Sequence, residues 1–225
     1  MLEKISTDSL PDSFVVFDLE TTGLDASQHE IIEIAAIRFK KGRTAHETLQ
    51  AVVKPKGAVP LKITELTGIT QEMVDRDGDP IRDALEGFAS FFGDLRLVSF
   101  NAEFDMAFLQ AAAKGCGLPP FKNSTSCALQ LARKAWPNRK SYRLDDLASD
   151  GEFNSGTAHR AMEDARRALI VYAAASAALN TTLTPQQVKI APRRRATPLV
   201  KKAPNGAGLL VGVAALFAYI SKIKD

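Results

Sequence analysis

The segment FVVFDLETTG, residues 14–23, joins a short apolar strand to two carboxylates. Four apolar residues lead to Asp18 and Glu20, which are two positions apart. Side chains at i and i+2 of a β-strand project from the same face, so these carboxylates are expected side by side. Two acids this close resist joint ionisation unless a cation lies between them. A strand that simply ends at the protein surface would also explain the pair, so the segment alone leaves the choice open.

The rest of the chain predicts an α/β fold with a mixed sheet flanked by helices, because strands come first and then alternate with helices. Predicted strands lie at residues 14–19, 31–39, 46–53 and 95–100. The first three form an antiparallel meander with a turn at Lys41 and Gly42. Predicted helices lie at residues 81–92, 102–115, 127–135 and 160–179, with Gly93 as a C-cap and Asn101 as an N-cap.

Charge and proline content divide the chain after Leu183. Residues 185–225 hold eight Lys or Arg against one acid, whereas residues 1–184 carry 21 basic and 25 acidic side chains. The net charge of +3 is therefore a property of the tail and does not indicate a basic face on the globular part. We expect an N-terminal extension at residues 1–12, a globular domain at 13–183, a basic Pro-containing linker at 184–204 and an apolar C-terminal helix at 205–225.

The C-terminal helix is compatible with three arrangements. Its strongly apolar part, residues 207–220, is 14 residues long, and a membrane span usually needs about 20. Basic residues on both sides and a Gly208-x-x-x-Gly212 spacing favour a membrane anchor through residues 205–221. The second arrangement is a helix that docks on the protein or pairs two chains as a dimer, and the third is disorder. Two cysteines, Cys116 and Cys127, fit a reducing cytoplasm, and the anchor would tether the protein to the cytoplasmic membrane.

Two later segments carry further acids. Asp105 lies one turn into the predicted helix of NAEFDMAFLQ, residues 101–110, where a favourable charge near a helix N-terminus is the simpler explanation. In HRAMEDARRAL, residues 159–169, His159 precedes Asp164 by five positions, and Asp164 lies among residues spaced for a buried helix face. Alone, His159 would be interpreted as a surface or capping residue.

In this order and at these separations, FDLETTG, FNAEFD and HRAMEDA resemble the three exonuclease motifs of the DEDDh family, the DnaQ-like 3′→5′ exonucleases. This group includes the proofreading epsilon subunit of bacterial DNA polymerase III. LTGITQEMVDR, residues 66–76, resembles the family's substrate-side loop, and YRLDDLA, residues 142–148, resembles its L-x-x-L-A segment. The resemblance covers roughly residues 12–180. Phe100 departs from it, because many members have a histidine at this position.

The resemblance implies a ribonuclease H-like fold with a five-stranded mixed sheet and two Mg²⁺ or Mn²⁺ ions. It assigns the metal ligands to Asp18, Glu20, Asp105 and Asp164, and the general base to His159. Near neutral pH a histidine can take the proton of the attacking water. The residues implied to hold the terminal nucleotide are Glu20, Thr21, Thr22, Gly23, Leu66, Thr67, Asn101 and His159.

The implied activity is hydrolysis of single-stranded or frayed DNA from its 3′ end by a two-metal mechanism, with release of 5′-mononucleotides. Unstacking of a terminal base before it enters the site favours such substrates. Two competing functions stay open: an RNA-trimming exonuclease similar to ribonuclease T, and an inactive nucleic-acid- or protein-binding scaffold of the same fold. The sequence leaves a DNA polymerase partner undecided. The tail does not resemble the polymerase-binding extension expected of a replicative proofreading subunit, which favours a free-standing or tethered enzyme.

Overall fold

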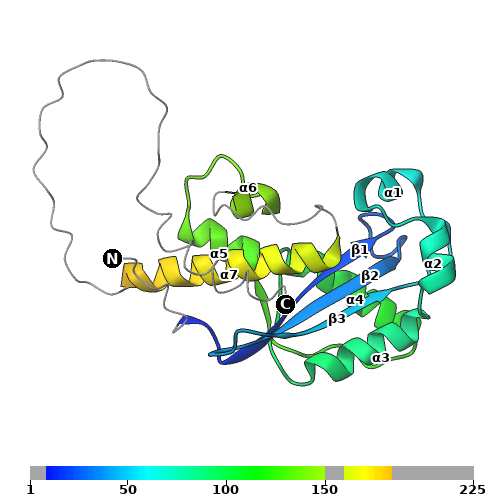
Figure 1. Cartoon of the computed structure of the whole chain (residues 1–225), viewed down its shortest axis with the longest axis horizontal. Coiled ribbons are helices and arrows are strands. Elements are labelled where there is room, and N and C mark those ends of the chain that lie inside the picture. Colours follow the sequence, from blue (N-terminus) through cyan, green and yellow to red (C-terminus); the bar gives the residue numbers. More distant parts are fainter. Residues whose placement is uncertain (1–8, 150–159, 184–225) are drawn as a thin grey trace, which may run out of the picture.

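A five-stranded mixed sheet forms the centre of the computed structural model, which describes residues 9–149 and 160–183 (Figure 1). The strand order is β3-β2-β1-β4-β5. The strands are β1 (Ser13–Thr21), β2 (Ile31–Lys40), β3 (Glu47–Val52), β4 (Leu97–Ser99) and β5 (Thr125–Cys127). Pairing is antiparallel from β1 through β2 to β3 and parallel from β1 through β4 to β5. The predicted meander and the five-stranded mixed sheet are both confirmed.

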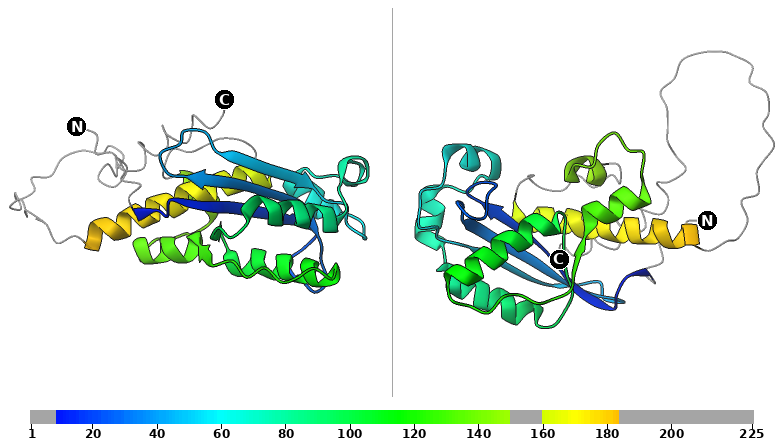
Figure 2. Two further views of the ribbon diagram at one scale, coloured as in Figure 1. Left: turned by 90° about the horizontal axis from the view of Figure 1, so that it is seen from below. Right: turned by 180° about the vertical axis from the view of Figure 1, so that it is seen from behind.

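Helices cover both faces of this sheet (Figure 2). One face packs against α3 (Ile81–Phe92) and α4 (Ala102–Gly115). The other packs against α7 (Ala161–Leu183), which also contacts α5 (Ala128–Ala135) and α6 (Leu144–Ser149). Two short helices, α1 (Leu61–Thr67) and α2 (Gln71–Asp77), lie between β3 and α3 in the chain.

Alternation along β1 decides which face receives the two carboxylates. Phe14 and Val16 are buried in the core under α7, whereas Val15 and Phe17 are buried in the core under α3 and α4. Asp18 and Glu20 continue the series of Phe14 and Val16, because side chains at i and i+2 share a face. The apolar part of β1 therefore fixes the acids on the α7 side of the sheet.

The segment at residues 66–76 differs from the expected loop, because it ends one helix and forms most of the next. Gly68 closes α1 in the left-handed conformation, with φ of 73°. The Thr70 hydroxyl then accepts a hydrogen bond from the Met73 backbone N–H, which caps α2. A left-handed glycine and an N-cap threonine two positions apart leave room only for a tight turn between the helices.

The starts of α4 and α5 agree with their predicted positions, but one capping contact is missing. Asn101 occupies the N-cap position of α4 but makes no capping hydrogen bond with its side chain. Cys127 ends β5 and is also the N-cap of α5 (Ala128–Ala135), so the helix predicted around residues 127–135 is confirmed. Phe100 packs against the core under α7, and its carbonyl accepts the Leu129 N–H at 3.0 Å. An apolar residue at position 100 therefore contributes to packing.

Several predictions concern residues outside the described part of the chain. These are His159, the linker at residues 184–204 and the apolar helix at 205–225, with its proposed anchoring and pairing. Within residues 9–149 and 160–183, no helix combines the length and the apolar character needed to cross a membrane. Leu10, from the end of the predicted N-terminal extension, is buried in the core under α7.

Candidate active site

Three predicted acids come together where the C-terminal part of β1 meets the first turn of α7. Asp18 and Glu20 come from β1, and Asp164 comes from α7. One carboxylate oxygen from each lies within 4.8 Å of the others. Such a set of oxygen donors suits a hard cation such as Mg²⁺ or Mn²⁺.

Asp105 approaches the same end of β1 from α4. It is only 4% exposed, and its Oδ2 accepts a hydrogen bond from the Ser99 hydroxyl at 2.8 Å. The Leu19 backbone N–H also donates to Asp105, so this carboxylate is tied to β1 between Asp18 and Glu20. Asp105 does not belong to the group within 4.8 Å, but its charge acts on Asp18.

The electrostatics of these acids favour binding of a cation. Burial, followed by repulsion from Asp164 and Glu33, raises the pKa of Glu20 to about 8. Burial raises the pKa of Asp105 to about 7. Burial and repulsion from Asp105, Asp164 and Glu20 raise the pKa of Asp18 well above its usual range. A divalent cation would relieve both the repulsion and the cost of burying these charges, so the donor set fits the implied metals.

Arg167 holds the Asp164 carboxylate from one turn further along α7. Its guanidinium is almost fully buried, with 5% of the side chain exposed, and Nη1 donates to Asp164 Oδ1 at 2.6 Å. The same nitrogen lies 3.4 Å from Asp145 Oδ1 on α6. Sequence reasoning missed Arg167, although its i, i+3 spacing from Asp164 is a signal for such a pair.

Glu33 is a second residue that sequence reasoning missed. It lies on β2 directly opposite Glu20 and is fully buried. Its carboxylate accepts hydrogen bonds from Arg160, Gln50 and the Ala161 backbone N–H. An acid within the apolar segment IIEIAAI was the available signal, because a charge is almost never fully buried unless it is paired.

The predicted nucleotide-binding residues after Asp18 form a closely packed turn. The Thr21 hydroxyl donates to the Gly23 carbonyl at 2.6 Å, and the Thr22 hydroxyl oxygen accepts the Glu30 N–H at 2.9 Å. The His29 ring approaches Gly23 so closely that a Cβ there would lie 2.5 Å from ring atoms. These contacts fix the backbone of the turn and occupy both threonine hydroxyls.

The remaining predicted nucleotide-binding residues lie on α1 and at the start of α4. Leu66 is 49% exposed, which is unusual for a large apolar side chain. Thr67 is buried, and its hydroxyl donates to the Ile63 carbonyl and accepts the Ile69 N–H. Asn101 is exposed. Thr67 therefore holds the end of α1, whereas Leu66 and Asn101 present accessible side chains.

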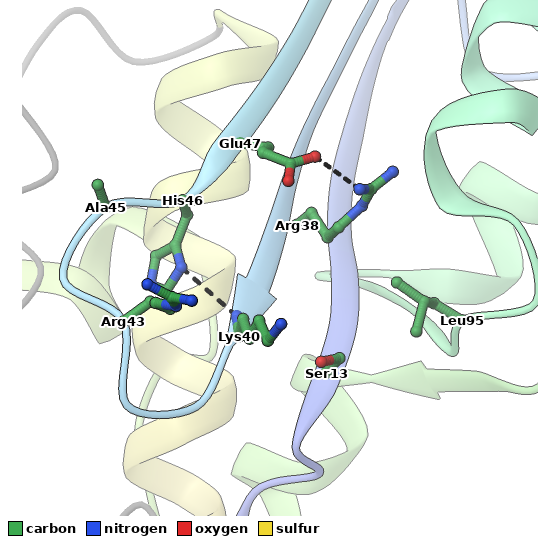
Figure 3. Close-up of a pocket in the computed structure, with 8 residues that line it drawn as sticks. All are labelled: Ser13, Arg38, Lys40, Arg43, Ala45, His46, Glu47 and Leu95. Atoms are coloured by element: carbon green, nitrogen blue, oxygen red, sulfur yellow. Dashed lines mark hydrogen bonds and ion pairs between the residues drawn. The ribbon is translucent and has the colours of Figure 1, made fainter.

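A separate pocket of about 390 Å³ lies near the opposite end of β1 (Figure 3). Its lining includes Ser13, the first residue of β1, together with Lys40, Arg43 and His46. Among the described residues that line it, Glu47 is the one carboxylate, and it forms an ion pair with Arg38 at 2.6 Å. The described lining therefore does not offer the grouped acids that a divalent metal requires.

The comparisons with solved structures agree with the architecture. Escherichia coli exonuclease I in complex with a dT13 oligonucleotide has a TM-score of 0.67 and 19% identity, over 77% of this chain and 43% of that one. Exonuclease X in complex with 5′ overhanging duplex DNA has a TM-score of 0.56 and 24% identity, over 76% of this chain and 93% of that one. At these identities the likeness supports the fold alone.

Sequence relatives extend the comparison to the family. The DNA polymerase III subunit epsilon of Aquifex aeolicus is 37% identical over 163 residues, which are 72% of this chain and 79% of that protein. The PolC-type DNA polymerase III of Caldanaerobacter subterraneus subsp. tengcongensis is 40% identical over 158 residues, or 70% of this chain. The matched region is only 11% of that polymerase's length. The profile of the family described as Exonuclease (RNase T) matches residues 15–172, and the chain belongs to this exonuclease family.

Proposed function

We propose that this chain is a metal-dependent 3′→5′ exonuclease that removes 5′-mononucleotides from the 3′ ends of single-stranded or frayed DNA. The observation that carries this proposal is the convergence of Asp18, Glu20 and Asp164 within 4.8 Å, in a chain of the exonuclease family. Membership of the family supports nuclease activity in general. The direction, the products and the two-metal mechanism are the proposed part.

Asp18, Glu20 and Asp164 would hold one divalent ion, and Asp18 would share a second with Asp105. When bound, two such ions supply activation of the attacking water and neutralisation of the leaving oxygen. The carboxylates would hold the two ions in fixed positions, because Asp18 and Glu20 lie on a strand and Asp164 lies on a helix. The acids are partly buried, which strengthens the electrostatic interactions among them relative to those in bulk water.

His159 is proposed as the general base that takes the proton of the attacking water. His159 lies just outside the second described range, which begins at residue 160, and five positions before Asp164 in the sequence. An imidazole is the side chain best suited to accept a proton near neutral pH.

The nucleotide at the 3′ end would be held by the backbone of the Thr21–Gly23 turn and by side chains around it. Accessible Leu66 is suited to contact an unstacked base, and Asn101 offers an amide for a hydrogen bond. DNA is favoured over RNA because the sequence relatives are named as DNA polymerase III proteins.

A substrate panel tests this function. The full chain is incubated with 5′-labelled single-stranded DNA, mismatched duplex DNA and RNA, in Mg²⁺, Mn²⁺ or EDTA. We expect a ladder of products shortened from the 3′ end, with DNA degraded faster than RNA and no degradation in EDTA. Faster trimming of RNA would favour an exonuclease similar to ribonuclease T. Inactivity on every substrate would favour a binding scaffold.

A further inference from the structure

The buried Glu33 carboxylate accepts four hydrogen bonds. Its Oε1 accepts from Arg160 Nη2 at 2.8 Å and from Gln50 Nε2 at 2.9 Å. Its Oε2 accepts from Arg160 Nε at 3.3 Å and from the Ala161 backbone N–H at 3.0 Å. Two of the four donors therefore belong to one guanidinium, which is the bidentate arrangement that arginine and carboxylate groups favour.

The Ala161 contact ties Glu33 to the beginning of α7. The Arg160 carbonyl accepts the Asp164 N–H at 3.0 Å, so the helical hydrogen bonds begin at Arg160. The Ala161 N–H is then one of the first-turn donors that have no partner inside the helix. Glu33 supplies both the missing acceptor and a negative charge at the positive end of the helix dipole.

Stability alone is a weak explanation for an acid at position 33. The neighbouring β2 residues Ile32 and Ile34 are apolar and fully buried, and well-packed apolar residues often replace buried ion pairs at no cost. Glu33 also adds negative charge beside Glu20 and Asp18. Burial by itself would raise the pKa of Glu33, but the hydrogen bonds from Arg160, Gln50 and Ala161 lower it, so the carboxylate stays charged.

We propose that Glu33 is a positioning residue that fixes the start of α7 on the sheet and so holds Asp164 beside Asp18 and Glu20 before metal binds. Glu33 lies opposite Glu20 in the β1–β2 pairing, while Asp164 is one turn from Arg160. One carboxylate thus sets the distance between the strand and the helix that contribute the metal ligands. This inference rests on the proposed metal-dependent function.

Glu33→Gln is the sharpest variant, because it keeps the shape of the side chain and removes its charge and one of its two acceptor oxygens. Gln50→Ala is the matched control, since it removes a hydrogen bond to the same carboxylate from β3 without touching α7. Hydrogen exchange in EDTA reports on the start of α7, over the roughly two turns at residues 160–167. Calorimetric titration with Mn²⁺, without nucleic acid, reports on the metal ligands.

For Glu33→Gln we expect faster exchange at the start of α7 and about 10–100-fold weaker Mn²⁺ binding, the range typical when residues that orient a metal site from outside its ligands are removed. Gln50→Ala should match the wild type in both measurements. Unchanged Mn²⁺ affinity in Glu33→Gln would overturn the inference, as would an equal loss in Gln50→Ala. If Glu33→Gln does not fold, Arg160→Gln is subjected to the same two measurements and the same criteria. A wild-type chain that binds Mn²⁺ but degrades no DNA would refute the proposed function and leave the positioning role standing.

Discussion

At the scale of single residues, the surroundings of the acids at the end of β1 move their pKa values far from those of free carboxylic acids. Asp18 and Glu20 follow an apolar run and are partly buried, and burial is the largest cause of their raised pKa values. Their common face could be predicted from the i, i+2 spacing alone. The pKa shifts could not, because they depend on Asp105 and Asp164, which only the fold brings near.

The raised pKa of Glu20 predicts how the metal-free chain responds to pH. Between its usual value of 4.5 and about 8, the folded chain retains a proton that the unfolded chain has released. The folded state binds more protons in this window, so its free energy of unfolding should fall as pH rises, by at most about 1.4 kcal/mol per pH unit for one group. Urea unfolding in EDTA at pH 5–8 measures this slope. Glu20→Gln should make this slope shallower, whereas Glu47→Gln, near the other end of the sheet, should leave it unchanged. Equal slopes in the wild type and both variants would contradict the pKa shift of Glu20.

The roles proposed for His159 and Asp18 predict different defects. His159→Ala should lower kcat by about 10²–10⁴-fold, the usual contribution of general acid–base catalysis, while Mn²⁺ binding stays near that of the wild type. Asp18→Ala should lose Mn²⁺ binding together with activity. Calorimetry and single-turnover degradation of single-stranded DNA separate the two defects. His159→Ala with wild-type kcat, or with lost Mn²⁺ binding, would contradict its role as a base.

At the scale of elements, the sequence predicted long periodic segments better than short ones. β2 is a continuous apolar segment, α3 and α4 have a helical apolar period, and the positions of all three are confirmed. β5 has three residues, too few to show a period, and its place in the sheet depends on parallel pairing with β4. The ion pair between Glu33 and Arg160, just before α7, was also missed, because the two residues are 127 positions apart.

A substitution of Arg167 tests how much the buried charges of α7 contribute to the free energy of unfolding. Arg167→Met keeps much of the apolar length but leaves Asp164 without this guanidinium, so we expect a loss of roughly 1–3 kcal/mol in the free energy of unfolding. Asp145→Asn is the matched control. Its carboxylate is 59% exposed in its pair with Arg167, and exposed pairs contribute about 0–1 kcal/mol. Urea unfolding in EDTA compares the two variants, and losses of similar size would argue against a special role for the Arg167–Asp164 pair.

At the scale of the whole molecule, the candidate site joins parts of the fold that are far apart in the sequence. Asp18 and Glu20 lie on the central strand, Asp164 lies on the helix that covers one face, and Asp105 lies on a helix that covers the other (Figures 1 and 2). The acids can come together only in the folded chain. A cation bound by them should therefore favour the folded state.

This coupling predicts that Mn²⁺ raises the melting temperature. At a Mn²⁺ concentration of about 100 times Kd, binding to the folded state alone contributes about 2.7 kcal/mol. For a chain of roughly 150–250 residues this corresponds to about 5–10 °C. The rise should disappear in Asp18→Asn, which removes the ligand assigned to both ions, and persist in Glu47→Gln. Calorimetric melting with Mn²⁺ or EDTA makes the comparison. An equal rise in Asp18→Asn would mean that the ion binds elsewhere, because loss of a shared ligand cannot leave affinity at both positions intact.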